Sequence, residues 1–159
     1  MATSLKNLSD HDPSGIPDGS SFSIGIAVAE WNPEVTNALL EGCVSTLLKA
    51  GVKEENIEVR FVPGTFELPM ACSWMAQQSK TDAVIGLGCV IQGETRHFDF
   101  ICDATANAMQ EVALRTNKPC IFGVLTTDNQ EQALDRAGGK HGNKGDEAGV
   151  TALKMIAIR

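Results

Sequence analysis

The chain has 159 residues, of which 43% are hydrophobic and 21% are charged, and its formal net charge is −7. This composition is typical of one globular domain with an ordinary core rather than of a disordered chain. Nucleic acids and anionic membranes both require a positive surface, so the acidic balance argues against either as the main partner. It does not exclude a small anionic substrate, because a few basic residues in one pocket can bind a phosphate.

Several features of the sequence predict a cytoplasmic location. No stretch approaches the roughly 18 apolar residues of a membrane-spanning helix, and the N-terminus lacks the pattern of a secretory signal. The cysteine count is odd, and no cysteine has the CxxC or Cys/His spacing of a metal site. We therefore expect reduced core thiols, no metal and no membrane contact. The five cysteines are Cys43, Cys72, Cys89, Cys102 and Cys120.

Apolar runs alternate with amphipathic stretches along most of the chain. A polar tail over residues 1–21, ordered only where something else pairs with it, precedes a single domain over residues 22–159. Four segments predict strands, at residues 22–29, 57–62, 83–91 and 120–125. Residues 22–29 are expected to be buried, and residues 83–91 form a near-continuous apolar run. Amphipathic stretches predict helices at about residues 33–50, 67–78, 98–114, 129–137 and 146–158.

Residues that start and stop helices support this division. Asn32 suits the N-cap of the first helix, with Pro33 at its first helical position, and Gly51 suits its C-terminal cap. Asp128 suits the N-cap of the short fourth helix, and a glycine-rich loop over residues 138–145 precedes the last one.

Strands that are apolar throughout and separated by helices predict a parallel sheet covered on both faces. The expected fold class is therefore α/β, a three-layer α/β/α sandwich around a four-stranded parallel sheet. Ligands of such sheets bind beyond the carboxyl ends of the strands. The loops expected to form a site are those that begin at Trp31, Pro63, Gln92 and Thr126.

Two of these features could carry chemistry. His97 follows the third strand, and its imidazole could give and take protons near neutral pH, or it could be a helix-start residue with no role. Arg136 and the glycine-rich loop 138–145, with Lys144, could bind a phosphate through guanidinium and backbone N–H groups. The alternative for this loop is a flexible basic turn, since it matches neither the Walker A nor the GxGxxG pattern.

Other residues on the same rim have weaker signals. Trp31 could stack on a planar ligand, as could Phe66 and Phe122, although core packing is an alternative for all three. Cys89 has no base beside it in sequence, so it is not expected to be a nucleophile. Further polar groups, each of which could be only a solvated loop residue or cap, are Thr65, Glu67, Glu94, Thr95 and Arg96.

The same residues carry a family resemblance. From about residue 23 to residue 158 the chain resembles lumazine synthases, because the family's segments occur in order and without gaps. These segments are AEWN at 29–32, VPGTFELP at 62–69, GCVIQGETRHFD at 88–99, FGVLTTDN at 122–129 and QALDRAGGKHGNKG at 132–145.

The resemblance implies a flavodoxin-like fold with strand order 2-1-3-4 and a transferase of riboflavin biosynthesis. The reaction condenses 5-amino-6-(D-ribitylamino)uracil with (S)-3,4-dihydroxy-2-butanone 4-phosphate, releases phosphate and water, and gives 6,7-dimethyl-8-ribityllumazine. No step requires a cofactor. The alternatives are a protein that binds lumazine or riboflavin without turnover, a structural shell protein and a flavodoxin-like electron carrier.

The resemblance also implies roles for individual residues. His97 occupies the position of the proton-transfer residue, and Trp31 that of an aromatic residue, often phenylalanine, that stacks on the pyrimidine. Glu94 is expected to contribute its backbone N–H, because a carboxylate would repel a phosphate. The uracil and ribityl sites are formed by Thr65, Phe66, Glu67, Cys89, Val90, Ile91 and Phe122. The phosphate site is formed by Glu94, Thr95, Arg136 and Lys144.

Members of the family assemble as homopentamers with active sites at subunit interfaces, and some build a shell of 60 subunits. Phe122 is therefore expected to reach a neighbouring subunit's site, and the N-terminal tail is a candidate for pairing with a neighbour. The chain lacks an insertion within residues 138–145 that some pentamer-only members carry, which permits a shell, whereas the prolines of the tail could hinder one. A riboflavin synthase partner is left open.

Overall fold

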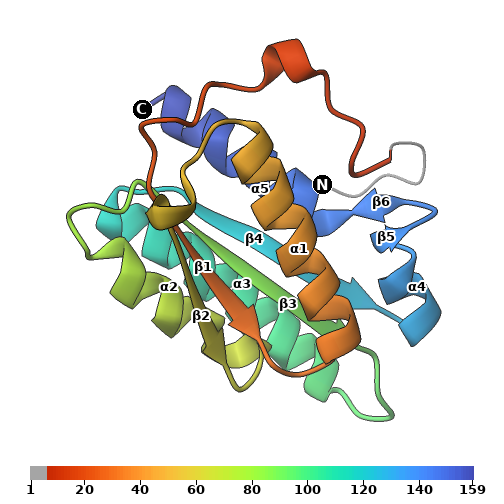
Figure 1. Ribbon diagram of the computed structural model, residues 1–159. Helices are drawn as coiled ribbons and strands as arrows, with labels where there is room; N and C mark the ends of the chain where they lie inside the picture. The colour runs from red at the N-terminus through yellow and green to blue at the C-terminus, as the bar shows by residue number, and fades with distance from the viewer. Residues whose placement is uncertain (1–6) are drawn as a thin grey trace.

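Four parallel strands form the centre of the molecule, in the order β2-β1-β3-β4 (Figure 1). The structure is a computed structural model that describes residues 7–159. The strands are β1 (Ile24–Ala29), β2 (Ile57–Val62), β3 (Ala83–Ile91) and β4 (Cys120–Thr127). The predicted four-stranded parallel sheet and its 2-1-3-4 order are confirmed, and all four carboxyl ends meet at one edge.

Two helices cover each face of the sheet, as the predicted three layers require (Figure 1). On one face α1 (Pro33–Lys49) packs against α5 (Lys144–Ala157), and on the other α2 (Leu68–Ala76) packs against α3 (His97–Thr116). Because side chains alternate along a strand, each strand contributes to both cores. In β1, for example, Ile26 packs on the α1–α5 side and Ala27 on the α2–α3 side.

Two glycines of β3 let the α2–α3 layer approach the sheet closely. A Cβ atom at Gly86 would come within 2.7 Å of the Met109 Cε, and one at Gly88 within 2.8 Å of the Thr65 Oγ1. Thr65 begins a short 3₁₀ turn, η3 (Thr65–Glu67), which leads directly into α2. The absence of a side chain at Gly88 therefore lets this turn lie against the end of β3.

Several predicted boundaries differ from the structure. The first strand starts at Ile24 rather than at residue 22, and β4 runs two residues beyond the predicted end. The fourth helix, α4 (Gln130–Leu134), is capped by Asn129, whose side chain accepts from the Gln132 N–H, so the prediction of Asp128 as its cap is wrong. A further short 3₁₀ turn, η2 (Glu54–Asn56), precedes β2.

The glycine-rich segment is more regular than a loop. It forms an antiparallel hairpin of β5 (Ala137–Gly139) and β6 (Gly142–Asn143), and α5 then begins at Lys144. Asn143 joins these parts, because its side-chain oxygen accepts from the Gly145 N–H at 2.7 Å while its amide donates to the Ala38 carbonyl of α1 at 2.8 Å.

Part of the N-terminal tail packs on its own chain. A 3₁₀ turn, η1 (Pro13–Gly15), interrupts it, and the segment crosses the α1–α5 side of the molecule (Figure 1). Gly19 N donates to the Ala50 carbonyl at 2.7 Å, and Leu8 N donates to the His141 carbonyl at 2.7 Å. Residues 1–6 of the predicted tail lie outside the described residues. Within residues 7–159, no helix is long and apolar enough to cross a membrane.

The start of α5 requires glycine at position 145. A Cβ atom there would overlap the Leu39 carbonyl oxygen of α1. Although alanine favours helices over glycine by about 1 kcal/mol, we expect Gly145→Ala to lower the free energy of unfolding by about 2 kcal/mol or more, because a backbone must move. Denaturant unfolding at matched protein concentration measures this change. Gly15→Ala is the control, since nothing lies within 4 Å of its Cβ position, and an equal loss in both variants would contradict the overlap.

Candidate active site

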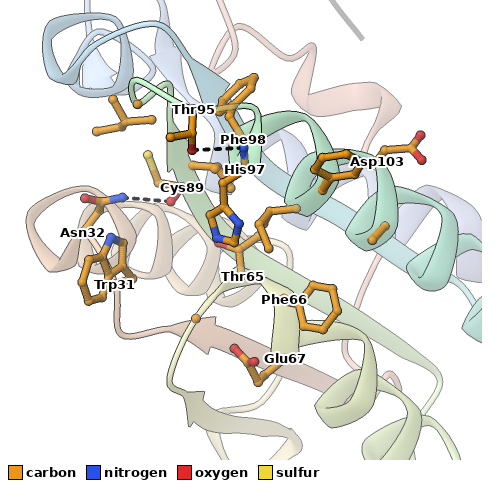
Figure 2. A pocket seen from close by; sticks show the side chains of 17 residues that line it. Trp31, Asn32, Thr65, Phe66, Glu67, Cys89, Thr95, His97, Phe98 and Asp103 are labelled. Carbon is orange, nitrogen blue, oxygen red and sulfur yellow. Dashed lines mark hydrogen bonds between the residues drawn. The ribbon is translucent and has the colours of Figure 1, made fainter.

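A pocket of about 920 Å³ opens at the carboxyl ends of β1 and β3. It lies where sheets of this class bind ligands. Its walls come from the loop after β1, the η3 turn, the end of β3 and the first two turns of α3 (Figure 2). Nine of the predicted site residues line it: Trp31, Thr65, Phe66, Glu67, Cys89, Val90, Ile91, Thr95 and His97.

Aromatic side chains form the rim of this pocket. Trp31 is 72% exposed, Phe66 is 56% exposed and Phe100 is 65% exposed. Exposed rings of this size are costly to leave in water, so they mark a surface that binds something. Figure 2 shows the His97 imidazole between Trp31 on one side and Phe66 on the other.

His97 is the first residue of α3 and is exposed to the pocket. Its backbone N–H donates to the Thr95 Oγ1 at 3.4 Å, which links the helix start to the loop after β3 (Figure 2). Within residues 7–159, no hydrogen bond or ion pair engages its ring. The imidazole is therefore accessible to a substrate that needs a proton donor or acceptor.

Asn32 holds the loop that carries Trp31. Its backbone has φ 59° and ψ 56°, a left-handed conformation that asparagine tolerates better than most residues. It occupies the N-cap position of α1 as predicted, but its side chain does not cap the helix. Instead its amide donates to the Cys89 carbonyl at 2.9 Å and joins the ends of β1 and β3 (Figure 2).

Thr65 contributes an unusual polar atom beside the pocket. The residue is 5% exposed, and its Oγ1 has no hydrogen-bond partner among residues 7–159. A buried hydroxyl without a partner costs free energy, on the order of 1–3 kcal/mol. Its backbone carbonyl, by contrast, accepts from the Thr105 hydroxyl of α3 at 3.5 Å. A bound polar ligand or water at this position would satisfy the hydroxyl.

Cys89 is held as a neutral thiol. Burial raises its pKa to about 11, because a thiolate would be poorly solvated there. The site therefore contains a polarisable but unreactive sulfur, which agrees with the expectation that Cys89 is not a nucleophile. All five cysteines are free.

Four predicted site residues do not line this pocket. Glu94 is exposed on the loop after β3, although its neighbours Gly93 and Thr95 do line the pocket. Phe122 lies within β4, where it packs against the α2–α3 core. Arg136 and Lys144 flank the β5–β6 hairpin, which contacts α1 and α4 on the opposite side of the sheet from α3.

Both basic groups beside the hairpin are fixed in place. The Arg136 Nη1 donates to the Gln132 carbonyl at 2.9 Å, and within residues 7–159 no carboxylate pairs with this guanidinium. Lys144 forms an ion pair with Glu147 at 3.0 Å, and its side chain is only 14% exposed. Nearby, the Asp135 carboxylate raises the pKa of Lys140.

Sequence reasoning missed the α3 side of the pocket. Phe98, Phe100, Ile101, Asp103 and Ala104 also line it, with Asn32, Gly64 and Gly93. His97, Ile101 and Ala104 recur at the spacing of one helix face, so the helix that His97 begins could have been followed into the site. No group of three or more potential metal-ligating side chains occurs within residues 7–159.

Comparison with known proteins matches residues 21–159 to the family model of 6,7-dimethyl-8-ribityllumazine synthase. Curated proteins of that name are similar over nearly their whole length. The Cytophaga hutchinsonii protein is 61% identical, with 99% of this chain and 98% of the relative covered. The Parabacteroides distasonis protein is 53% identical, with 98% of each covered, and the Porphyromonas gingivalis protein is 52% identical, with 99% and 98% covered. A match of this extent places the chain in the 6,7-dimethyl-8-ribityllumazine synthase family.

Proposed function

We propose that this chain condenses 5-amino-6-(D-ribitylamino)uracil with (S)-3,4-dihydroxy-2-butanone 4-phosphate and releases phosphate and water. The observation that carries the proposal is that nine family-type site residues, among them an accessible histidine, gather in one pocket of a chain that matches the family over residues 21–159. The reaction is the penultimate step of riboflavin biosynthesis, and the cytoplasm is the expected location.

The pocket suits a flat, polar substrate. Trp31 offers an aromatic face for the pyrimidine ring. The Thr65 hydroxyl, which is unpartnered, and the Glu67 carboxylate supply groups for the ribityl hydroxyls. The apolar residues Phe66, Val90 and Ile91 surround the rings. Holding both substrates in one pocket removes much of the entropic barrier to their reaction.

His97 is proposed to move protons between the two substrates. The amine attacks the ketone, and the adduct loses water to give an imine. The carbon next to the imine then loses a proton and phosphate is eliminated, after which the second nitrogen closes the ring with loss of another water. Each step transfers a proton to or from nitrogen, oxygen or carbon, and an imidazole beside the reacting atoms can donate or accept it.

Arg136 and Lys144 are proposed to bind the phosphate, with Thr95 and the backbone N–H of Glu94. Because the hairpin that carries Arg136 and Lys144 lies away from the pocket of its own chain, we infer that a neighbouring subunit supplies them. Phe122 is assigned to a neighbour's site in the same way. The leaving phosphate dianion would then be stabilised by charge from two subunits.

A homopentamer fits the exposed apolar surface. The residues Phe66, Met70 and Trp74 follow one another at four-residue spacing along η3 and α2, and each is more than half exposed. They form an apolar stripe beside the pocket mouth, and such surfaces are typical of subunit contacts.

The proposed reaction is tested by a turnover assay with both substrates. We expect lumazine fluorescence and released phosphate to appear in equal amounts, and Arg136→Ala to reduce kcat/KM by about 100-fold or more, because a charged contact to the leaving group is lost. Binding of the uracil without product above the uncatalysed rate would instead indicate a binding protein.

Removing the imidazole tests its role. We expect His97→Gln to lower kcat by about 100-fold, the usual contribution of a positioned acid–base group, while the Kd of the uracil changes by about threefold or less. Stopped-flow turnover and fluorescence titration measure the two quantities. Asp103→Asn is the control, because it changes another pocket-lining polar group whose carboxylate points away from His97 (Figure 2). Equal losses of turnover and binding in His97→Gln would contradict proton transfer.

Mixing two inactive variants tests whether sites are shared between subunits. Separate His97→Gln and Arg136→Ala proteins, unfolded and refolded together in equal amounts, should regain about a quarter of the wild-type activity. Random assembly gives that fraction of interfaces with both residues intact. If both residues act within one subunit, no activity returns. Each variant refolded alone is the control.

A further inference from the structure

The N-terminal segment of residues 7–9 is bonded to the β5–β6 hairpin. Leu8 N donates to the His141 carbonyl at 2.7 Å, and the Ser9 hydroxyl accepts from the Asn143 N–H at 2.9 Å. These two bonds join positions more than 130 residues apart in sequence. They involve the turn of the hairpin and its second strand, so the tail holds the hairpin along its β6 side.

The tip of the hairpin is shaped to receive this segment. Gly142 has a φ of +80°, a conformation that glycine adopts readily. A Cβ atom at Gly142 would overlap the Asn7 side-chain oxygen and come within 2.6 Å of the Ser9 nitrogen. The segment therefore occupies the space that any other residue at position 142 would fill.

The base of the hairpin brings two basic residues together. Arg136 directly precedes β5 and Lys144 directly follows β6. Lys144 N donates to the Arg136 carbonyl at 2.8 Å, so the two backbones lie side by side at the base of the hairpin. Asn143, the residue that Ser9 contacts, is adjacent to Lys144 in sequence and paired with Ala137. A shift of this strand would therefore move both basic residues.

We propose that residues 7–9 are a positioning segment for the phosphate site, which holds the β5–β6 hairpin so that Arg136 and Lys144 present a preorganised pair of cations. This inference rests on the proposed function, which assigns both residues to the phosphate. Strands of two and three residues are marginally stable by themselves, so an outside contact matters here. Donors that are fixed before binding lose less entropy when an anion arrives.

The full-length double variant Leu8→Pro/Ser9→Ala removes the Leu8 N–H donor and the Ser9 acceptor. We expect the KM for the sugar phosphate and the Ki of inorganic phosphate to rise together by about 3- to 10-fold, as the loss of two hydrogen bonds predicts. The KM for the uracil should stay within about twofold, because its pocket is built from other elements. Amide hydrogen exchange of residues 139–144 should become faster.

Two further variants control for general damage to the tail. Ser14→Ala also removes a tail hydroxyl, but among the described residues this hydroxyl bonds only the Asp12 carboxylate in its own turn, so phosphate affinity should not change. Ser9→Thr keeps a hydroxyl and should stay near wild type.

Equal rises in the KM of both substrates, or faster amide exchange with unchanged phosphate inhibition, would overturn the positioning role. Should the wild type show no turnover, the proposed reaction fails separately. Calorimetric binding of inorganic phosphate to wild type and double variant then decides the positioning role, and equal affinities would refute it.

Discussion

The parallel pairing of β1 with β3 is the constraint on which the rest of the site depends. Its register runs from Ile24 opposite Ala83 to Val28 opposite Leu87, and β3 then continues to Ile91, beyond the end of β1 at Ala29. The loop that carries Trp31 therefore starts beside the last residues of β3. The bond from the Asn32 amide to the Cys89 carbonyl joins this loop to β3. The parallel direction of the strands is enough to place a pocket at this edge of the sheet. The residues in the loops after β1 and β3 then determine its chemistry.

The site also depends on close packing of the η3 turn against β3. Without a side chain at Gly88, the η3 turn can place Thr65 against the strand, and the buried Thr65 hydroxyl then borders the pocket. The free energy lost by this unpartnered hydroxyl is offset by the apolar core that α2 forms with Ala27 and Val84. A site that keeps an unsatisfied group in the free state is prepared for a polar ligand.

The sequence predicted most of the fold because its signals are local. The strands predicted at 57–62 and 83–91 matched β2 and β3 to the residue, and their separation by helices implied parallel order. Only the second is a continuous apolar run, because β2 contains Glu58 and Arg60 and is largely exposed. Asn32 and Asp128 show where local reasoning fails, because both are good cap residues. The Asn32 side chain makes a tertiary contact instead of capping α1. The helix α4 is capped by Asn129, the residue after Asp128. The hairpin at 137–143 escaped notice because short glycine-rich strands have no apolar period. The roles of Arg136 and Phe122 stay predictions that only an assembly can test.

The apolar stripe of Phe66, Met70 and Trp74 has a consequence for the isolated chain in solution. The folded chain exposes three large apolar side chains at four-residue spacing along η3 and α2, which favours non-specific aggregation. The net charge of −7 acts in the opposite direction, since like-charged chains repel one another at distances beyond contact. Colloidal stability of the isolated chain therefore rests on long-range repulsion, whereas the stripe acts only at contact. Salt screens the charge repulsion but not the apolar contacts, so ionic strength determines whether the chain stays in solution or precipitates.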